Sequence, residues 1–151
     1  MDTSYEVLRA MPSLADAPDA SIRWLADHVD PVRFEPGDIL IREGAADRDC
    51  YFIVSGVTDV TFAGTSLGPT GPGEPEGEMA MFFRRARSGT TVAITRVDAL
   101  RLRAADYDTF DATDPALAEA FRTAILNHLS SARGITAEDS AARVRSLSGS
   151  S

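Results

Sequence analysis

The sequence predicts an α+β domain in which a helix, a set of closely spaced strands and further helices follow one another along the chain. Three observations lead to this fold class. Apolar residues recur with a helical period near the N-terminus, short β-rich runs separated by Gly and Pro fill the middle, and a helical period returns near the C-terminus. The chain has 151 residues, of which 44% are hydrophobic and 25% charged, which is typical of one folded domain.

The first predicted element is a helix from Pro18 to about Val29. Ile22 and Leu25 precede Val29 at spacings that place all three on one face of an α-helix. Pro18 fits the first helical position because its missing N–H has no partner there, and Asp19 brings a negative charge to the positive end of the helix dipole. We therefore expect an amphipathic N-terminal helix.

The middle of the chain, from residue 31 to about residue 103, is rich in β-branched, aromatic and large apolar residues that occur in short runs. Segments with Gly, Pro and Asp separate these runs, at a spacing of about ten residues per strand. Such strands are typical of a sandwich, a jelly roll or a small barrel. The predicted strands are Val32–Phe34, Ile39–Ile41, Tyr51–Val54, Val57–Phe62, Thr90–Ile94 and Ala99–Leu102.

Residues 64–77 contain five glycines and three prolines. Proline lacks the N–H that a ladder needs, and glycine weakens both helices and strands. We therefore predict a loop without regular structure that leads to Glu78.

Helical periodicity returns near the C-terminus. Asp114 fits the N-cap of a helix, Pro115 its first position and Gly134 the residue that stops it. A short helix over residues 136–147 and a frayed tail are expected next, so that residues 1–134 form the domain and residues 135–151 follow it. The apolar face of the main helix consists of Leu117, Phe121, Ile125 and Leu129.

Charge and cysteine content exclude several classes of function. With 23 acidic and 15 basic residues the net charge is −8, which disfavours binding to nucleic acid or to an anionic membrane. Cys50 is the single cysteine, so we expect neither a disulfide framework nor a cysteine-rich zinc site. The longest purely apolar run spans five residues, Met79 to Phe83, and the N-terminus does not have the pattern of a signal peptide, so a cytoplasmic location is expected.

The basic charge is concentrated in residues 84–103, which hold six arginines and one aspartate. Gly77, just upstream, lets the backbone approach a ligand closely, and Arg87 offers a planar fork of donors that matches two phosphate oxygens. Ser88 adds a neutral donor, and N–H groups at the start of a short helix can point at an anion. A carboxylate at Glu78 would accept hydrogen bonds from sugar hydroxyls. Phosphate and sugar together indicate a nucleotide.

The segments Gly77–Met81 and Arg87–Thr90, with eight residues between the glutamate of the first and the arginine of the second, resemble the phosphate-binding cassette of cyclic nucleotide-binding domains. Upstream, Phe34–Gly44 and Tyr51–Gly56 resemble the first strands of the β-roll that this family shares with the cAMP receptor protein and with protein kinase A regulatory subunits. The resemblance covers about residues 12–133. It implies an antiparallel, jelly-roll-like β-roll, or double-stranded β-helix, flanked by an N-terminal helix and C-terminal helices.

The resemblance also implies a role for individual residues of the cassette. Glu78 would bind the ribose 2′-hydroxyl, and Arg87 would neutralise the cyclic phosphate. The backbone N–H of Ala80 and the hydroxyl of Ser88 would complete the phosphate shell, and serine in place of threonine at residue 88 favours cAMP over cGMP. The implied nucleotide-binding residues are Gly77, Glu78, Met79, Ala80, Arg87, Ser88, Gly89 and Thr90.

A moving part is implied as well. Met79 and Phe82 would lie on the apolar hinge that shifts when phosphate binds, and the helix around residues 125–131 would close over the base. The 17 residues after Gly134 are too few for the DNA-reading helix-turn-helix that transcription factors of the family carry. We therefore expect a stand-alone sensor of cAMP or cGMP that uses no metal and transmits movement of its C-terminal helices to a protein partner or a homodimer.

Three features depart from the family pattern. Glu76 stands where the family commonly has an aromatic or aliphatic residue, Gly89 stands where it usually has alanine, and the loop before the cassette is longer and richer in proline. These features leave open an alternative, in which the β-roll is a ligand-free interaction module with a degraded pocket.

The remaining polar residues predict no second site. Glu74 and Glu76 are expected to be loop acids and not metal ligands, since no His or Cys is adjacent. Arg84 and Arg85 are expected to be solvated. The two histidines of the chain are isolated in the sequence, so the spacing of residues does not indicate a catalytic Ser–His–Asp triad. We therefore do not expect an enzyme.

Overall fold

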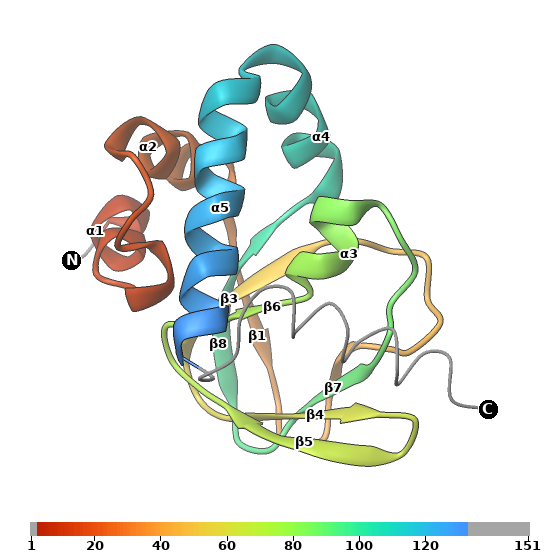
Figure 1. Cartoon of the computed structure of the whole chain (residues 1–151). Helices are drawn as coiled ribbons and strands as arrows, with labels where there is room; N and C mark the ends of the chain where they lie inside the picture. The colour runs from red at the N-terminus through yellow and green to blue at the C-terminus, as the bar shows by residue number, and fades with distance from the viewer. Residues whose placement is uncertain (1–2, 133–151) are drawn as a thin grey trace.

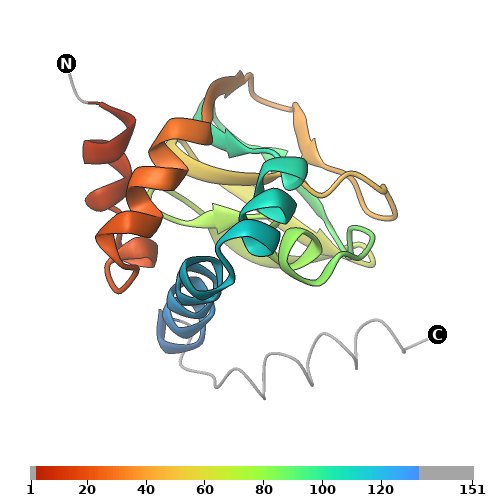
Figure 2. The same cartoon turned by 90° about the horizontal axis from the view of Figure 1, so that it is seen from above.

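The computed structural model describes residues 3–132, in which helices from both ends of the chain pack against one side of a β-roll (Figure 1). Seen from above, the N-terminal and C-terminal helices gather beside the same sheet (Figure 2). This arrangement confirms the predicted α+β fold class. The helices are α1 (Ser4–Arg9), a 3-10 helix (Pro12–Leu14), α2 (Asp19–His28), α3 (Glu78–Phe83), α4 (Ala104–Thr113) and α5 (Pro115–Ala132).

The strands of the described residues form two four-stranded antiparallel sheets. One sheet has the order β1-β8-β3-β6 and the other the order β2-β7-β4-β5. The six predicted strands match β1, β2, β3, β4, β7 and β8 to within two residues at either end. The strands are β1 (Asp30–Phe34), β2 (Ile39–Ile41), β3 (Cys50–Ser55), β4 (Thr58–Phe62), β5 (Thr65–Thr70), β6 (Pro75–Glu76), β7 (Thr90–Ala93) and β8 (Val97–Leu102).

Strand β3 lies between two hydrophobic clusters, and its sequence shows why. Successive side chains of a strand point to opposite faces. Tyr51 and Ile53 pack between the two sheets, whereas Cys50 and Phe52 pack against the helices. Because both faces are covered, four apolar residues in succession are buried, and the run shows no alternation of polar and apolar residues.

The predicted helices at both ends are present in the described residues. Helix α2 buries Ile22 and Leu25 as expected, but it begins at Asp19, so Pro18 precedes the helix and does not occupy its first position. Helix α5 begins at Pro115 as predicted and carries fully buried apolar residues in the predicted register. The predicted stop at Gly134 and everything predicted for residues 135–151 lie outside the described residues.

The prediction of an irregular loop over residues 64–77 was wrong, because this segment contains β5 and β6. Both are edge strands of their sheets. Proline is tolerated at an edge, where one side of the strand makes no ladder hydrogen bonds. Pro69 of β5 lies opposite Asp59 of β4, and Pro75 of β6 lies opposite Phe52 of β3.

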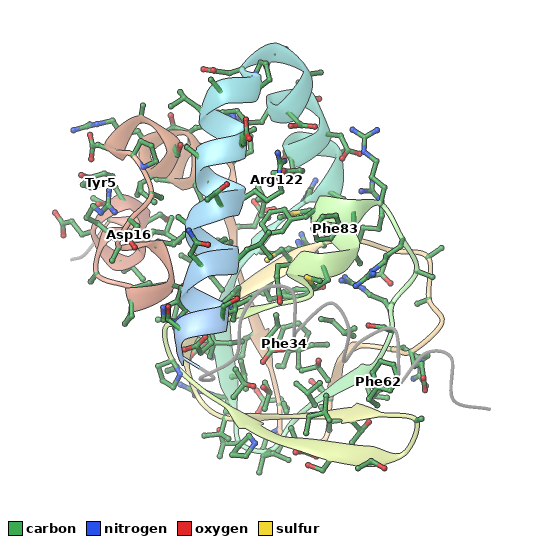
Figure 3. All side chains as sticks on the ribbon, viewed as in Figure 1. Tyr5, Asp16, Phe34, Phe62, Phe83 and Arg122 are labelled. Atoms are coloured by element: carbon green, nitrogen blue, oxygen red, sulfur yellow. The ribbon has the colours of Figure 1, made fainter. Side chains whose placement is uncertain are left out.

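Helix α4 was missed because its apolar residues stand among acids. Ala104, Tyr107 and Phe110 are buried at a spacing of three residues, which marks one narrow helical face. The aromatic ring of Phe110 stacks on Trp24 of α2 with ring centroids 3.9 Å apart. Through this face α4 joins the N-terminal helices to α5, and Arg122 of α5 points toward it (Figure 3).

Candidate functional site

Gly77 connects β6 to α3 and has a backbone that favours glycine. Its φ of +84° lies in the left-handed region, where residues with a Cβ are strained. A Cβ at this position would stand 2.5 Å from Nη1 of Arg87 and 2.8 Å from Cδ1 of Ile41. The missing side chain therefore lets the guanidinium of Arg87 pack directly on the backbone that leads into α3.

Arg87 holds a buried positive charge at the centre of the site. Its side chain is 1% exposed. Nη1 donates to the carbonyl of Gly77 at 3.1 Å, and Nη2 donates to the carboxylate of Asp47 at 2.9 Å and to the carbonyl of Asp49 at 2.6 Å. Nε is buried without a hydrogen-bond partner among the described residues. The guanidinium is positively charged, so the unused donor can serve an anion that enters the site.

The segment between β2 and β3, residues 42–49, wraps around Arg87 and brings the two cassette motifs together. The N–H of Gly44 donates to the carbonyl of Arg87 at 2.8 Å, and the N–H of Arg87 donates to the carbonyl of Ala45 at 3.0 Å. The N–H of Glu43 donates to the hydroxyl of Thr90 at 3.0 Å. The predicted Thr90 therefore anchors this segment through its side chain.

Gly89 allows a second close approach of two backbones. A Cβ at this residue would lie 2.6 Å from the carbonyl oxygen of Thr61, in the strand that pairs with β7. The departure from the family pattern at residue 89 thus permits tight pairing at the start of β7. Ser88, the residue before it, is partly exposed beside the buried Arg87.

Helix α3 points its apolar side toward the C-terminal helices. Ala80, Met81 and Phe82 are buried. The ring of Phe82 lies 5.4 Å from the ring of Tyr107 in α4 and 5.9 Å from the ring of Phe121 in α5. Met79 and Glu78 are partly buried. The structure thus brings the predicted hinge residue Phe82 into contact with both helices.

The expectation of loop acids upstream of Gly77 holds for Glu74, which precedes β6, but was wrong for Glu76. Glu76 lies in β6, is 6% exposed and accepts a hydrogen bond from the hydroxyl of Thr58 at 2.9 Å, which connects the two sheets. Glu74 lies 3.3 Å from Nε2 of His128 in α5. The segment that leads into the cassette is therefore bound to the opposite sheet and to the C-terminal helix. Sequence reasoning missed both contacts because their partners are distant in the chain.

Burial keeps the neighbouring cysteine neutral. Cys50 is fully buried, and burial raises the pKa of its thiol well above the ordinary value. The Glu78 carboxylate adds to this rise, while the positive charge of Arg87 opposes it. A neutral thiol is a poor nucleophile and a poor metal ligand. Cys50 therefore acts as a small buried apolar residue.

Arg84 and Arg85 lie at the end of α3, outside the buried part of the site. Both are exposed, as predicted, although Arg84 lies 3.6 Å from the carboxylate of Asp108. Arg85 stands over the ring of Phe83, an exposed residue at the end of the helix (Figure 3). These arginines add positive potential near the site without contacting Arg87.

The features outside the cassette define no competing site. A cavity of about 440 Å³ lies between α1 and the outer face of the first sheet, and no cassette residue lines it. Over residues 3–132, no three His, Cys, Asp or Glu side chains come close enough to hold a metal ion. In the same part of the chain, no helix has the length and hydrophobicity needed to cross a membrane.

Comparison with known proteins identifies the fold and the motif together. The family described as "Cyclic nucleotide-binding domain" matches residues 31–114, which contain the whole cassette. A cyclic nucleotide-gated potassium channel from Mesorhizobium japonicum is 34% identical over 90 residues, which cover 60% of this chain and 25% of the channel. A Pycsar effector protein from Burkholderia cepacia is 36% identical over 69 residues, which cover 46% of this chain and 23% of the effector. The chain thus matches about a quarter of the length of either relative.

Solved structures contain the same arrangement of strands and helices. The N-terminal domain of a transcriptional regulator from Streptomyces coelicolor superimposes with a TM-score of 0.67 at 26% identity, over 86% of this chain and 96% of that domain. The likeness extends over almost all of that domain.

Proposed function

The chain belongs to the family of cyclic nucleotide-binding domains, and on this premise we propose that it is a sensor that binds a cyclic nucleotide, cAMP in preference to cGMP. It acts as a regulatory domain and not as an enzyme. Residues 1–134 form the sensor domain. Its location is the cytoplasm, which the single buried cysteine favours because secreted domains commonly carry disulfides.

The buried guanidinium of Arg87 is the observation that carries this proposal. Its protein acceptors occupy Nη1 and Nη2, and its Nε–H has no partner among the described residues. The carboxylate of Asp47, which pairs with Nη2, belongs to a side chain that is half exposed to solvent. An anion with two oxygens in the right geometry would therefore add charge-assisted hydrogen bonds to a donor that the fold already holds in place. The cyclic phosphate is such an anion.

The remaining roles follow the family pattern, residue by residue. Glu78, at the start of α3 and partly buried, accepts hydrogen bonds from the ribose 2′-hydroxyl. The N–H of Ala80 and the hydroxyl of Ser88 complete the phosphate shell, with Gly77, Met79, Gly89 and Thr90 as backbone and supporting positions. Serine at residue 88 favours adenine over guanine.

The response to ligand travels through the apolar side of α3. Phe82 contacts Tyr107 of α4 and Phe121 of α5, so a shift of α3 changes the packing of both helices. Binding selects the arrangement of α4 and α5 that fits an occupied cassette and shifts a pre-existing equilibrium. The helices then pass the change to a protein partner or to a second copy of the chain.

Calorimetric titration of the purified chain with cAMP and, in parallel, with cGMP tests the proposal. We expect a dissociation constant on the order of micromolar or tighter for at least one of them, and a lower value for cAMP. Tighter binding of cGMP would contradict the base preference alone. Absence of heat with both nucleotides, together with an unchanged melting temperature, would contradict the sensor function.

One observation favours a second candidate, an interaction module that binds no ligand. Asp47 already forms an ion pair with Arg87 at 2.9 Å, so the charge of the guanidinium is partly neutralised inside the protein. In that case the β-roll serves only as a scaffold. Arg87→Ala would then change the melting temperature without changing any nucleotide response.

A further inference from the structure

The three consecutive residues Asp47, Arg48 and Asp49 make contacts in two directions. Toward the cassette, the carboxylate of Asp47 and the carbonyl of Asp49 accept hydrogen bonds from Nη2 of Arg87. Toward the C-terminal helices, the carboxylate of Asp49 accepts a hydrogen bond at 2.9 Å from the N–H of Ala104, the first residue of α4. The anion-binding guanidinium and the start of α4 are therefore held by the same short segment.

Arg48 is the residue that binds this segment to both neighbouring helices. Its Nη2 lies 2.6 Å from one carboxylate oxygen of Asp108 in α4, and its Nη1 lies 3.4 Å from the other. The same Nη1 is 3.3 Å from the carbonyl of Met81 in α3. The Arg48 and Asp108 side chains are only 22% and 28% exposed, so solvent screens this pair less than a surface pair.

From these contacts we propose that Arg48 is a positioning residue that couples occupancy of the Arg87 site to the position of α4. A phosphate that accepts from the unpartnered Nε–H and, with a second oxygen, from the neighbouring Nη2 competes with Asp47 and Asp49 for Nη2, so the segment that contains them shifts. Arg48 carries that shift to Asp108, whereas the Phe82 contacts carry the shift of α3 itself. The inference rests on the proposed function and adds a polar connection to the apolar one.

Hydrogen exchange of the α4 amides in the whole chain tests this coupling, with and without saturating cyclic nucleotide. We expect the ligand to change exchange across residues 104–113 in the wild type. Arg48→Gln should still bind the ligand in calorimetry, because residue 48 does not contact Arg87, but the ligand-dependent change in α4 should disappear. Arg48→Lys keeps the charge opposite Asp108 and should recover part of that change.

Two further variants separate coupling from simple loss of stability. Arg33→Gln removes an arginine from another carboxylate pair, between Arg33 of β1 and Asp98 of β8, and should leave the α4 response intact. Asp108→Asn should also abolish the α4 response, although it weakens the pair with Arg84 as well. The double variant should therefore lose no more of the response than Asp108→Asn alone.

Three results would overturn the inference while leaving ligand binding intact. These are a full α4 response in Arg48→Gln, a wild type whose α4 does not respond to bound ligand, and ligand-free Arg48→Gln in which α4 already exchanges freely. The last result would mean that Arg48 only stabilises the helix. A wild type that binds neither cAMP nor cGMP would instead contradict the proposed function, on which the inference depends.

Discussion

Replacing Arg87 by alanine removes the one buried guanidinium that the proposed site depends on. In the ligand-free protein, this change takes the donor away from the carbonyls of Gly77 and Asp49 and from the carboxylate of Asp47. Asp47 is half exposed and can bind water instead, so the main cost falls on the two carbonyls. We expect stability to fall by about 1–3 kcal/mol, which leaves a folded protein.

The effect on binding should be much larger than the effect on stability. A cyclic phosphate that receives two charge-assisted hydrogen bonds from the guanidinium gains about 1.5–3 kcal/mol from each. Losing both removes about 3–6 kcal/mol, which corresponds to a factor of about 10²–10⁴ in the dissociation constant. Arg87→Lys should fall between alanine and wild type, because an ammonium keeps the charge but cannot reproduce the planar fork.

Calorimetric titration measures these affinities, and thermal unfolding of each variant shows whether it is folded at the temperature of the titration. Arg33→Ala is the control, because Arg33 of β1 pairs with Asp98 of β8 and is not part of the cassette. It should bind like the wild type. If a folded Arg87→Ala protein binds the same nucleotide within about threefold of the wild-type affinity, a difference below 1 kcal/mol, the site assignment is wrong.

Three further predictions concern the surroundings of the site. Gly77→Ala should destabilise the protein by about 3 kcal/mol or more in urea unfolding, since it adds a clash with Arg87 to a left-handed backbone. Gly44 has a similar φ of +82° but open space around a new Cβ, so Gly44→Ala should lower the stability by only about 1–2 kcal/mol. An equal loss of stability in the two variants would contradict the role of close packing at Gly77. The Cys50 thiol should resist a thiol reagent at pH 8 until the protein unfolds, because burial raises its pKa, and rapid modification of native protein would argue against this burial. Burial also raises the pKa of Tyr107, so its stabilising contribution is present below the ordinary tyrosine pKa of about 10 and is lost as the pH rises through its higher folded pKa. Tyr107→Phe should therefore flatten the alkaline limb of a curve of stability against pH, and an unchanged limb would exclude Tyr107 as its cause.

Much of this protein could be predicted from local sequence patterns. The strand around Tyr51–Val54 was found because a β-branched and aromatic run followed by a turn at Ser55–Gly56 describes a buried strand wherever it pairs. The register of α5 followed from Phe121 and Ile125, which recur with the period of a helix. The cassette was recognised because Gly77 and Arg87 belong to a motif whose spacing is set within one short segment of chain.

Errors arose where the surroundings overrode local preference. Residues 64–77 have the composition of a loop, yet β5 and β6 form there because an edge strand needs hydrogen bonds on one side only. Helix α4 has a weak apolar pattern, and its stability comes from packing Tyr107 and Phe110 against other helices. Glu76 belongs to a stretch of polar residues, but its strand carries it into the interior beside Thr58.

The sequence by itself determined the α+β class, the helices α2 and α5, the strands with β-rich runs and the family, because each of these depends on residues that are close together in the chain. Only the tertiary structure decided what surrounds Arg87. Asp47 and Asp49 lie about forty residues upstream, and Asp108 lies 60 residues beyond Arg48. The folding of the strands brings these charges within hydrogen-bond distance, and the pattern of a single sequence contains no record of such a pairing.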